Sequence, residues 1–433
     1  MRPSQRLDRF LSVSTLAARV YLGYKAISLA ERRLGIKDAP ARRSAHHTWS
    51  ATQLYQLAVR RQGLLIKFGQ LLGSRPDLIP DEYIPVLSRL QDQVPPKPFA
   101  AIKRLITSEL ERPLRDVFPR FEREPIAAAS LAQVHRARLK DGTPVAVKVQ
   151  YPGIWEIVHN DLQSMRFLLR ILNALERNLD LSPIIQELMH NIPQELDFIN
   201  EGHNAEIIAK NFAGREDIIV PRIFWEYTTR RVLVMEYLEG VKITDVDALQ
   251  GAGIDLQAVS QLVTDAYCEQ LFLHGMFHAD PHPGNLFVRP GPKLIMLDFG
   301  LCRRLDDQFR LGYARLVNAM LTWNPGEMVR AFHDLGFRVR NPNDPTPYLT
   351  IGRAFMESSA PGRAYADPDL VAEANARVAR AVRANPFVDI PREFLLIMRA
   401  TGLLSGLGKH LDSRVDMIGT LLPYTRAALE GAA

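Results

Sequence analysis

A strip of polar residues in the second half of this chain constrains its fold more than any other feature. His278-Ala-Asp280-Pro-His-Pro-Gly-Asn285 is followed, 13 residues after the asparagine, by Asp298-Phe-Gly. The hydrophobic run 293–297 between them predicts a short buried strand. Either motif alone is compatible with an ordinary surface turn. Their ordered combination favours a phosphoryl-transfer site, in which Asp280 orients a nucleophile or water and Asn285 and Asp298 bind Mg²⁺ through oxygen atoms.

An upstream strand supplies the lysine that such a site requires. Val145-Ala-Val-Lys148-Val alternates with period 2, and Asp141-Gly-Thr-Pro144 before it predicts a hairpin turn after a first arm at 133–139. We therefore predict that Lys148 contacts the α- and β-phosphates of ATP.

Four small residues precede this hairpin, where a protein kinase carries its glycine-rich loop: Ala127, Ala128, Ala129 and Ser130. Alanine does not readily adopt the positive φ angles open to glycine, so a phosphate cradle made here must have a different shape. The structural alternative is a helix or tight packing. Lys148, 19 residues after Ala129, favours the phosphate loop.

A carboxylate on a helix is expected to hold Lys148, and Glu195 is the favoured candidate. Asp197 and Glu201 are close competitors, and an acidic helix face in solvent explains the same residues equally well.

A predicted strand at 231–235 is followed by a segment that resembles a kinase hinge, the connection whose backbone binds adenine. Met235, Glu236 and Leu238 would line the adenine site, although Met235 suits a buried core equally well.

With these motifs, the chain resembles the UbiB family of atypical kinase-like ATPases, also called AarF-domain proteins. The resemblance extends from about residue 55 to about 410 and is weakest at its end, Leu395–Ala400. It rests on five segments: Lys67-Phe-Gly-Gln70, Leu90-Gln-Asp-Gln-Val-Pro-Pro96, the alanine-rich loop, Glu195-Leu-Asp-Phe198 and His278–Asn285.

The resemblance implies an α+β, two-lobed protein-kinase-like fold with an N-terminal helical extension over the active site. Lys67 and Gln70 would gate that site, which would use ATP and Mg²⁺ to support prenyl-quinone (ubiquinone-type) or lipid metabolism. The expected divisions are a helical extension at 1–100, a small lobe at 101–236 and a large lobe at 237–433.

The chain departs from the family pattern in two places. Ala132 replaces the usual glycine of the alanine-rich loop, and Arg303 and Arg304 follow the Asp298 motif. After Gly300 no Ala-Pro-Glu motif appears, which argues against a segment that docks protein substrates.

Three alternatives to an ATPase or small-molecule kinase stay open. They are a nucleotide-sensing pseudokinase scaffold that remodels a complex or handles lipid, a protein kinase acting in trans, and a phosphotransferase like those acting on choline or aminoglycosides. The last of these would lack the Lys67–Gln70 motif.

Charge is concentrated at the start of the chain. The net charge is +6, yet residues 1–62 hold 12 Lys and Arg against 3 Asp and Glu. An amphipathic basic helix there predicts peripheral contact with anionic lipid. The alternative is that its apolar stripe packs on the protein body. The Arg-rich, acid-poor start is also compatible with a transit peptide. No nucleic-acid motif accompanies the charge. The apolar stripe comprises Phe10, Val13, Leu16, Ala17, Val20, Tyr24 and Ile27.

The remaining composition indicates a globular enzyme. Two cysteines, Cys268 and Cys302, lie far apart in no metal-ligand spacing and suggest a reducing compartment. The sequence contains no run of 18 apolar residues, so it does not predict a membrane span. We therefore expect a cytoplasmic protein, with or without peripheral membrane contact.

Overall fold

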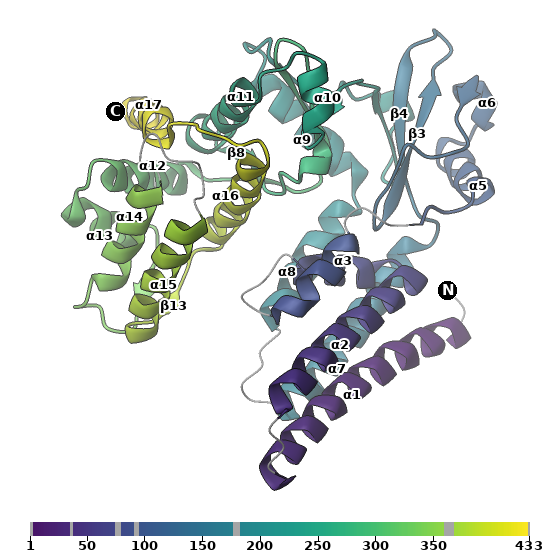
Figure 1. Cartoon of the computed structure of the whole chain (residues 1–433). Helices are drawn as coiled ribbons and strands as arrows, with labels where there is room; N and C mark the ends of the chain where they lie inside the picture. The colour runs from purple at the N-terminus through teal and green to yellow at the C-terminus, as the bar shows by residue number, and fades with distance from the viewer. Residues whose placement is uncertain are drawn as a thin grey trace. The chain divides into compact units, whose positions relative to one another are not determined.

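The computed structural model describes residues 3–34, 38–73, 79–90, 95–175, 182–358 and 368–431. The chain divides into two compact units (Figure 1). The first comprises Met1–Asn200 and Ile223–Tyr237, and the second comprises Glu201–Arg222 and Leu238–Ala433. Residues 91–94 of the predicted Leu90–Pro96 motif lie outside the described residues.

The first unit combines helices with one antiparallel sheet of order β1-β3-β4-β6, in which β2 also pairs with β3. Helix α9 (Phe198–Asn211) begins in this unit and continues into the second unit. The helices are α1 (Pro3–Leu34), α2 (Ala39–Arg61), α3 (Leu64–Gly73), α4 (Ile84–Leu87), α5 (Phe99–Leu110), α6 (Leu114–Val117), α7 (Ile154–Leu175), α8 (Ser182–Glu195) and α9 (Phe198–Asn211), and the strands are β1 (Arg120–Phe121), β2 (Ala127–Ala128), β3 (Ala132–Arg138), β4 (Pro144–Gln150) and β6 (Val232–Glu236).

The predicted hairpin of the first unit is present as β3 and β4. Gly142 adopts a positive φ of 88°, and the Asp141 carboxylate accepts a hydrogen bond from the Thr143 backbone N–H, which closes the turn. Strand β4 is the central strand, and six of its seven residues are buried. This burial explains the nearly continuous apolar sequence around Lys148.

Helix α1 lies along α2 and α7 (Figure 1). The apolar stripe considered for lipid contact is mostly half-buried: Phe10 meets the Phe167 ring of α7 at 5.9 Å, and the Tyr24 and Tyr83 hydroxyls lie 3.2 Å apart. Packing on the protein body therefore accounts for that stripe. A second stripe faces outward, with exposed fractions from 51 to 62%: Leu7, Leu11, Leu22 and Leu29.

Over its described residues, the second unit is mostly helical and contains three small sheets, of order β5-β10-β9-β7, β11-β8 and β12-β13. Its elements are β5 (Ile218–Ile219), β7 (Val241–Lys242), α10 (Val246–Gly251), α11 (Leu256–Cys268), a π-helical stretch (Glu269–His274), β8 (Met276–His278), β9 (Leu286–Arg289), β10 (Lys293–Met296), β11 (Cys302–Arg304), α12 (Asp307–Leu321), α13 (Pro325–Asp334), β12 (Arg338–Val339), α14 (Thr346–Ser358), α15 (Pro368–Ala384), β13 (Phe387–Asp389), α16 (Arg392–His410) and α17 (Met417–Glu430).

Side-chain caps mark where several of these helices begin. Asp306 accepts a hydrogen bond from the Phe309 N–H at the start of α12, and Asn324 accepts one from the Glu327 N–H at the start of α13. The core that α12, α13 and α14 share includes stacked aromatic rings, with Phe332 on Tyr348 at 4.9 Å. Among the helices of the described ranges, none is both long and apolar enough to cross a lipid bilayer.

Candidate phosphoryl-transfer site

The second unit carries Asp280, Asn285 and Asp298 on the connections of its short strands. Asn285 immediately precedes β9, and Asp298 lies two residues after the end of β10. Leu286 pairs with Met296, and the Leu297 N–H donates to the Asn285 carbonyl at 2.9 Å. Asn285 and Asp298 therefore emerge from the same end of one hairpin, the arrangement that a shared metal site requires.

The buried His278 ring joins the Asp280 loop to this hairpin. The Asp280 backbone N–H donates to His278 Nδ1 at 3.1 Å, so the ring proton resides on Nε2, which lies 3.3 Å from the Leu297 carbonyl oxygen. One imidazole thus connects the loop of Asp280 to the residue before Asp298. His278 was predicted only as part of the motif, and this bracing role emerges from the tertiary structure.

Asp298 itself occupies a sparsely populated backbone region. Its φ is +61°, which aspartate and asparagine tolerate better than most other residues. The segment is held on both sides, because Asn204 Nδ2 donates to the Phe299 carbonyl at 3.0 Å and the Ala279 N–H donates to the Leu301 carbonyl at 2.9 Å. Such conformations persist where surrounding contacts enforce them, and they concentrate at functional sites.

Asp280 meets a basic residue that is distant in the sequence. Arg399 of α16 places Nη2 3.2 Å from Asp280 Oδ1. The two side chains are 27% and 23% exposed, respectively. The sequence offered no local signal for this contact, because the partners are 119 residues apart.

Two buried groups near these carboxylates are held protonated. Burial, together with the carboxylates of Glu201 and Asp298, raises the pKa of the Cys302 thiol well above its usual range. Burial also raises the pKa of the Tyr267 hydroxyl, with smaller contributions from Cys302 and Asp280. Cys302 is therefore not poised as a thiolate nucleophile. Both cysteines are free and buried.

The oxygen donors present fit a magnesium ion. Among the described residues, no group of three or more His, Cys, Asp and Glu side chains is arranged to hold a metal. Asn285 and Asp298 would supply two oxygen ligands. Magnesium commonly keeps several waters and binds through few protein oxygens plus substrate phosphates, so a two-residue donor set is sufficient.

The first unit presents Lys148 from the middle of its sheet. Lys148 pairs with Val134 on β3 and with Leu233 on β6, and its side chain is largely buried. Its Nζ lies 5.3 Å from the centre of the Phe198 ring at the start of α9. The predicted lysine thus occupies a central strand, where its ammonium group is largely shielded from solvent.

Glu195, at the end of α8, contacts a lysine of the Lys67–Gln70 motif. Lys67 Nζ lies 2.8 Å from Glu195 Oε1, and both side chains are mostly buried. This pair joins the Lys67–Gln70 motif to the Glu195 motif. The role of Glu195 toward Lys148 stays a prediction.

The other polar residue of the Lys67–Gln70 motif has a structural contact. Gln70 Nε2 donates to the Leu90 carbonyl at 2.8 Å. Gly69 allows α3 to approach the same residue, since a Cβ there would lie 2.4 Å from Leu90 Cδ1. The gating roles of Lys67 and Gln70 stay predictions.

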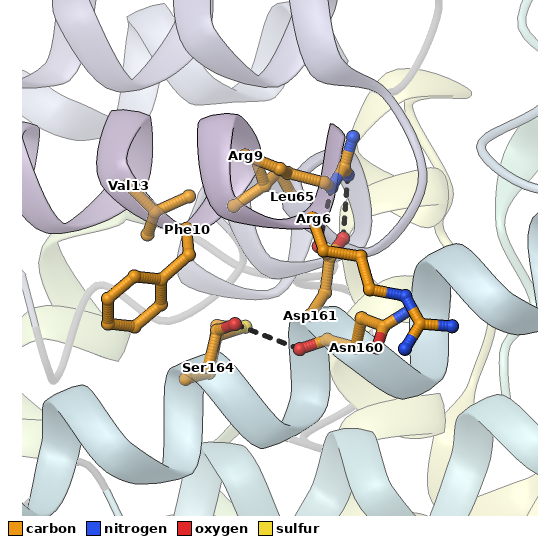
Figure 2. A pocket seen from close by; sticks show the side chains of 9 residues that line it. Arg6, Arg9, Phe10, Val13, Leu65, Asn160, Asp161 and Ser164 are labelled. Carbon is orange, nitrogen blue, oxygen red and sulfur yellow. Dashed lines mark hydrogen bonds and ion pairs between the residues drawn. The ribbon is translucent and has the colours of Figure 1, made fainter. Parts of the chain in front are cut away.

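A buried ion pair anchors the turn that precedes α3. Figure 2 shows Arg9 of α1 facing Asp161 of α7, with Nε 2.5 Å from Oδ1 and Nη2 2.6 Å from Oδ2. The same guanidinium donates to the carbonyls of Arg61 and Gln62 at 2.6 and 2.7 Å. Gln62 and Gly63 both have positive φ angles, so Arg9 stabilises an unusual turn directly before the helix that carries Lys67.

The alanine-rich loop is half strand and half turn: Ala127 and Ala128 form β2, and a tight turn follows at Ala129. The Ala129 N–H donates to the Ala132 carbonyl at 2.8 Å, and the buried Tyr151 hydroxyl donates to the Ala129 carbonyl at 2.9 Å. Ala127 and Ala129 are exposed, Ala128 is half-buried and Ser130 is buried. The contact of this loop with phosphate stays a prediction.

We expect Tyr151→Phe to loosen this turn. It removes a hydroxyl donor but leaves the ring, so unfolding free energy should fall by about 1–2 kcal/mol. Denaturant unfolding measures the change, with Tyr237→Phe, at a half-buried tyrosine, as the matched loss of a hydroxyl. Equal stability of Tyr151→Phe and the wild type would show that this bond contributes nothing.

The predicted adenine hinge begins where β6 ends. Met235 is buried and pairs with Ala146, and Glu236 pairs with Val145. The two compact units divide between Tyr237 and Leu238. The segment thus connects the units, and the adenine contacts of Met235, Glu236 and Leu238 stay predictions.

Comparison with known proteins gives consistent similarities. Residues 89–332 match the family model of the ABC1 atypical kinase-like domain. The chain is 36% identical over 396 residues to Protein ACTIVITY OF BC1 COMPLEX KINASE 8, chloroplastic, of Arabidopsis thaliana, across 83% of this chain and about half (51%) of that protein. It is 32% identical over 421 residues to AarF domain-containing protein kinase 1 of Gallus gallus, across 95% of this chain and 80% of that protein.

One solved structure shows the same fold. The complex of Rv3197 with erythromycin from Mycobacterium tuberculosis superposes with a TM-score of 0.60 at 24% identity, covering 82% of this chain and 90% of that chain.

Proposed function

Because this chain belongs to the ABC1 atypical kinase-like domain family, we propose that it is an Mg²⁺-dependent ATPase or small-molecule kinase. The observation that carries the proposal is the placement of Asn285 and Asp298 at one end of the β9–β10 hairpin, braced through His278 to the loop of Asp280. These are the metal-binding and nucleophile-orienting parts of a kinase site.

Each proposed role follows from the chemistry of the side chain. Lys148 binds the α- and β-phosphates, and Asn285 and Asp298 hold Mg²⁺, which when bound offsets the charge of the phosphate oxygens. Asp280 orients the hydroxyl or water that attacks the γ-phosphate. Most of this catalysis would come from positioning and charge.

A small acceptor is favoured over a protein. Strand β11 ends at Arg304 and α12 begins at Asp307, so little chain follows the Asp298 motif in which a protein substrate could dock. Water or a small molecule, such as a quinone precursor or a lipid, suits this arrangement. The second candidate is a nucleotide-sensing scaffold. It is favoured by the ion pair of Lys67 with Glu195, because that pair occupies the carboxylate expected to hold Lys148.

Steady-state ATP hydrolysis tests the proposal. The purified chain would be assayed with MgATP, with and without a quinone-precursor phenol, and again after EDTA treatment; nucleotide binding would be measured in parallel. We expect turnover that requires Mg²⁺. Nucleotide binding with no turnover under any condition would contradict the enzyme and favour the scaffold.

We also propose that α1 contacts an anionic bilayer through its outer leucine stripe, Leu7, Leu11, Leu22 and Leu29. A helix of 32 residues spans roughly 48 Å, and the stripe extends along most of that length, from Leu7 to Leu29. Its acidic residues Asp8 and Glu31 are ion-paired with Arg61 and Arg43. The exposed charge is therefore dominated by cations, which complement anionic headgroups: Arg6, Arg19, Lys25, Arg32 and Arg33.

Vesicle flotation measures this contact. Changing all four leucines to glutamine should abolish binding to vesicles of phosphatidylcholine and phosphatidylglycerol, since it removes the apolar area that enters the interface. Val388→Gln with Ile390→Gln, which removes exposed apolar side chains elsewhere, should leave binding unchanged. Equal flotation of the four-leucine variant and the wild type would refute a role for the stripe.

A further inference from the structure

The contact between Arg399 and Asp280 is built from two anchored elements. On α16, the neighbours Ile397 and Ala400 are 0% and 1% exposed and belong to the core of the second unit. On the other side, Phe277 and Ala279 are equally buried beside Asp280. Both backbones are therefore fixed, and the 3.2 Å approach of the guanidinium to the carboxylate is set by the fold rather than by two flexible side chains meeting in solvent.

The strip around Asp280, residues 278–288, contains neither lysine nor arginine, while Asp298 and Glu201 add negative charge around Cys302 in the same unit. A carboxylate that must work beside the phosphates of ATP experiences strong repulsion. A nearby guanidinium offsets that repulsion, and its planar donors also restrict how the carboxylate is oriented.

We propose that Arg399 is a positioning residue of the phosphoryl-transfer site. It holds Asp280 in the orientation in which the carboxylate accepts the proton of the attacking hydroxyl or water, and it supplies the positive charge that the strip lacks. This role rests on the proposed function of Asp280. The proposal also gives a functional role to α16, whose sequence carries the weakest part of the family resemblance.

Kinetics of Arg399 variants with chemical rescue test this role. Arg399→Ala should lower kcat for MgATP turnover by about 10- to 100-fold, the value of a hydrogen bond to a charged group. KM for MgATP should rise by a smaller factor than kcat falls, because the contact mainly orients Asp280 and only secondarily offsets its repulsion of the phosphates. Arg399→Lys should be intermediate, since lysine keeps the charge without the planar fork.

Guanidinium chloride, kept well below denaturing concentrations, should restore part of the kcat of Arg399→Ala. It should not raise the thermal midpoint of this variant. Arg392→Gln is the matched control, as an exposed arginine on the same helix. An Arg399→Ala enzyme with unchanged or raised kcat, or a lowered kcat that guanidinium does not restore, would overturn the role while leaving the proposed function in place. A wild-type chain without turnover would overturn both.

Discussion

Asp298→Asn is expected to lower Mg²⁺-dependent ATP turnover by about a thousandfold or more and to leave the fold intact. The carboxylate is the only charged member of the proposed metal pair, and loss of several kcal/mol of charge stabilisation corresponds to this factor. Asparagine is the appropriate replacement because it tolerates the +61° φ of this position as well as aspartate does. Steady-state kinetics at saturating Mg²⁺ and the thermal midpoint would be measured together.

Asp307→Asn provides the control for this substitution. It neutralises a carboxylate nine positions further along that is 87% exposed, and turnover should be unchanged. If Asp298→Asn retained more than a tenth of wild-type kcat with the same Mg²⁺ requirement, Asp298 would not be a metal ligand.

Asp161→Ala is expected to destabilise the chain by about 3–5 kcal/mol, the largest stability effect among the substitutions considered. It leaves the Arg9 guanidinium buried without its carboxylate, and removing one partner of a buried pair has this cost. The side chains of Arg9 and Asp161 are 9% and 5% exposed, so solvent screens little of the interaction. Denaturant unfolding measures the change.

Two further variants separate the charge from the packing. The pair Arg9→Met with Asp161→Leu should recover part of the loss, although the carbonyls of Arg61 and Gln62 would lose their donor. Asp38→Ala removes one partner of the exposed Arg42–Asp38 pair and should change stability by less than about 1 kcal/mol. A similarly small effect of Asp161→Ala would mean that the buried pair does not anchor α1.

Local sequence patterns were sufficient to predict many of the strands and turns of this protein. Alternation around Lys148 predicted a strand, the apolar run at 293–297 predicted β10, and the turn residues at 141–144 predicted the hairpin between β3 and β4. The family resemblance and the kinase-like α+β fold are confirmed by the comparisons. These features succeed because side-chain periodicity and turn chemistry act over a few residues.

The first helix shows where a pattern was insufficient. Apolar residues occur on two of its faces, so the sequence did not identify which one packs inward; the stripe containing Val13 does, and the stripe containing Leu22 is exposed. The division of the chain also depends on packing, since residues 201–222 join the second unit and the helices before residue 101 share a core with the β3–β4 sheet.

The sequence by itself determined the elements, the order of the motifs and the family. Only the tertiary structure decided which charged groups meet. Arg9 with Asp161, Lys67 with Glu195 and Arg399 with Asp280 are each separated by more than a hundred residues, and no local pattern specifies them. Such partners are selected by how helices and strands pack, because burying an unpaired charge is too unfavourable for other arrangements to persist.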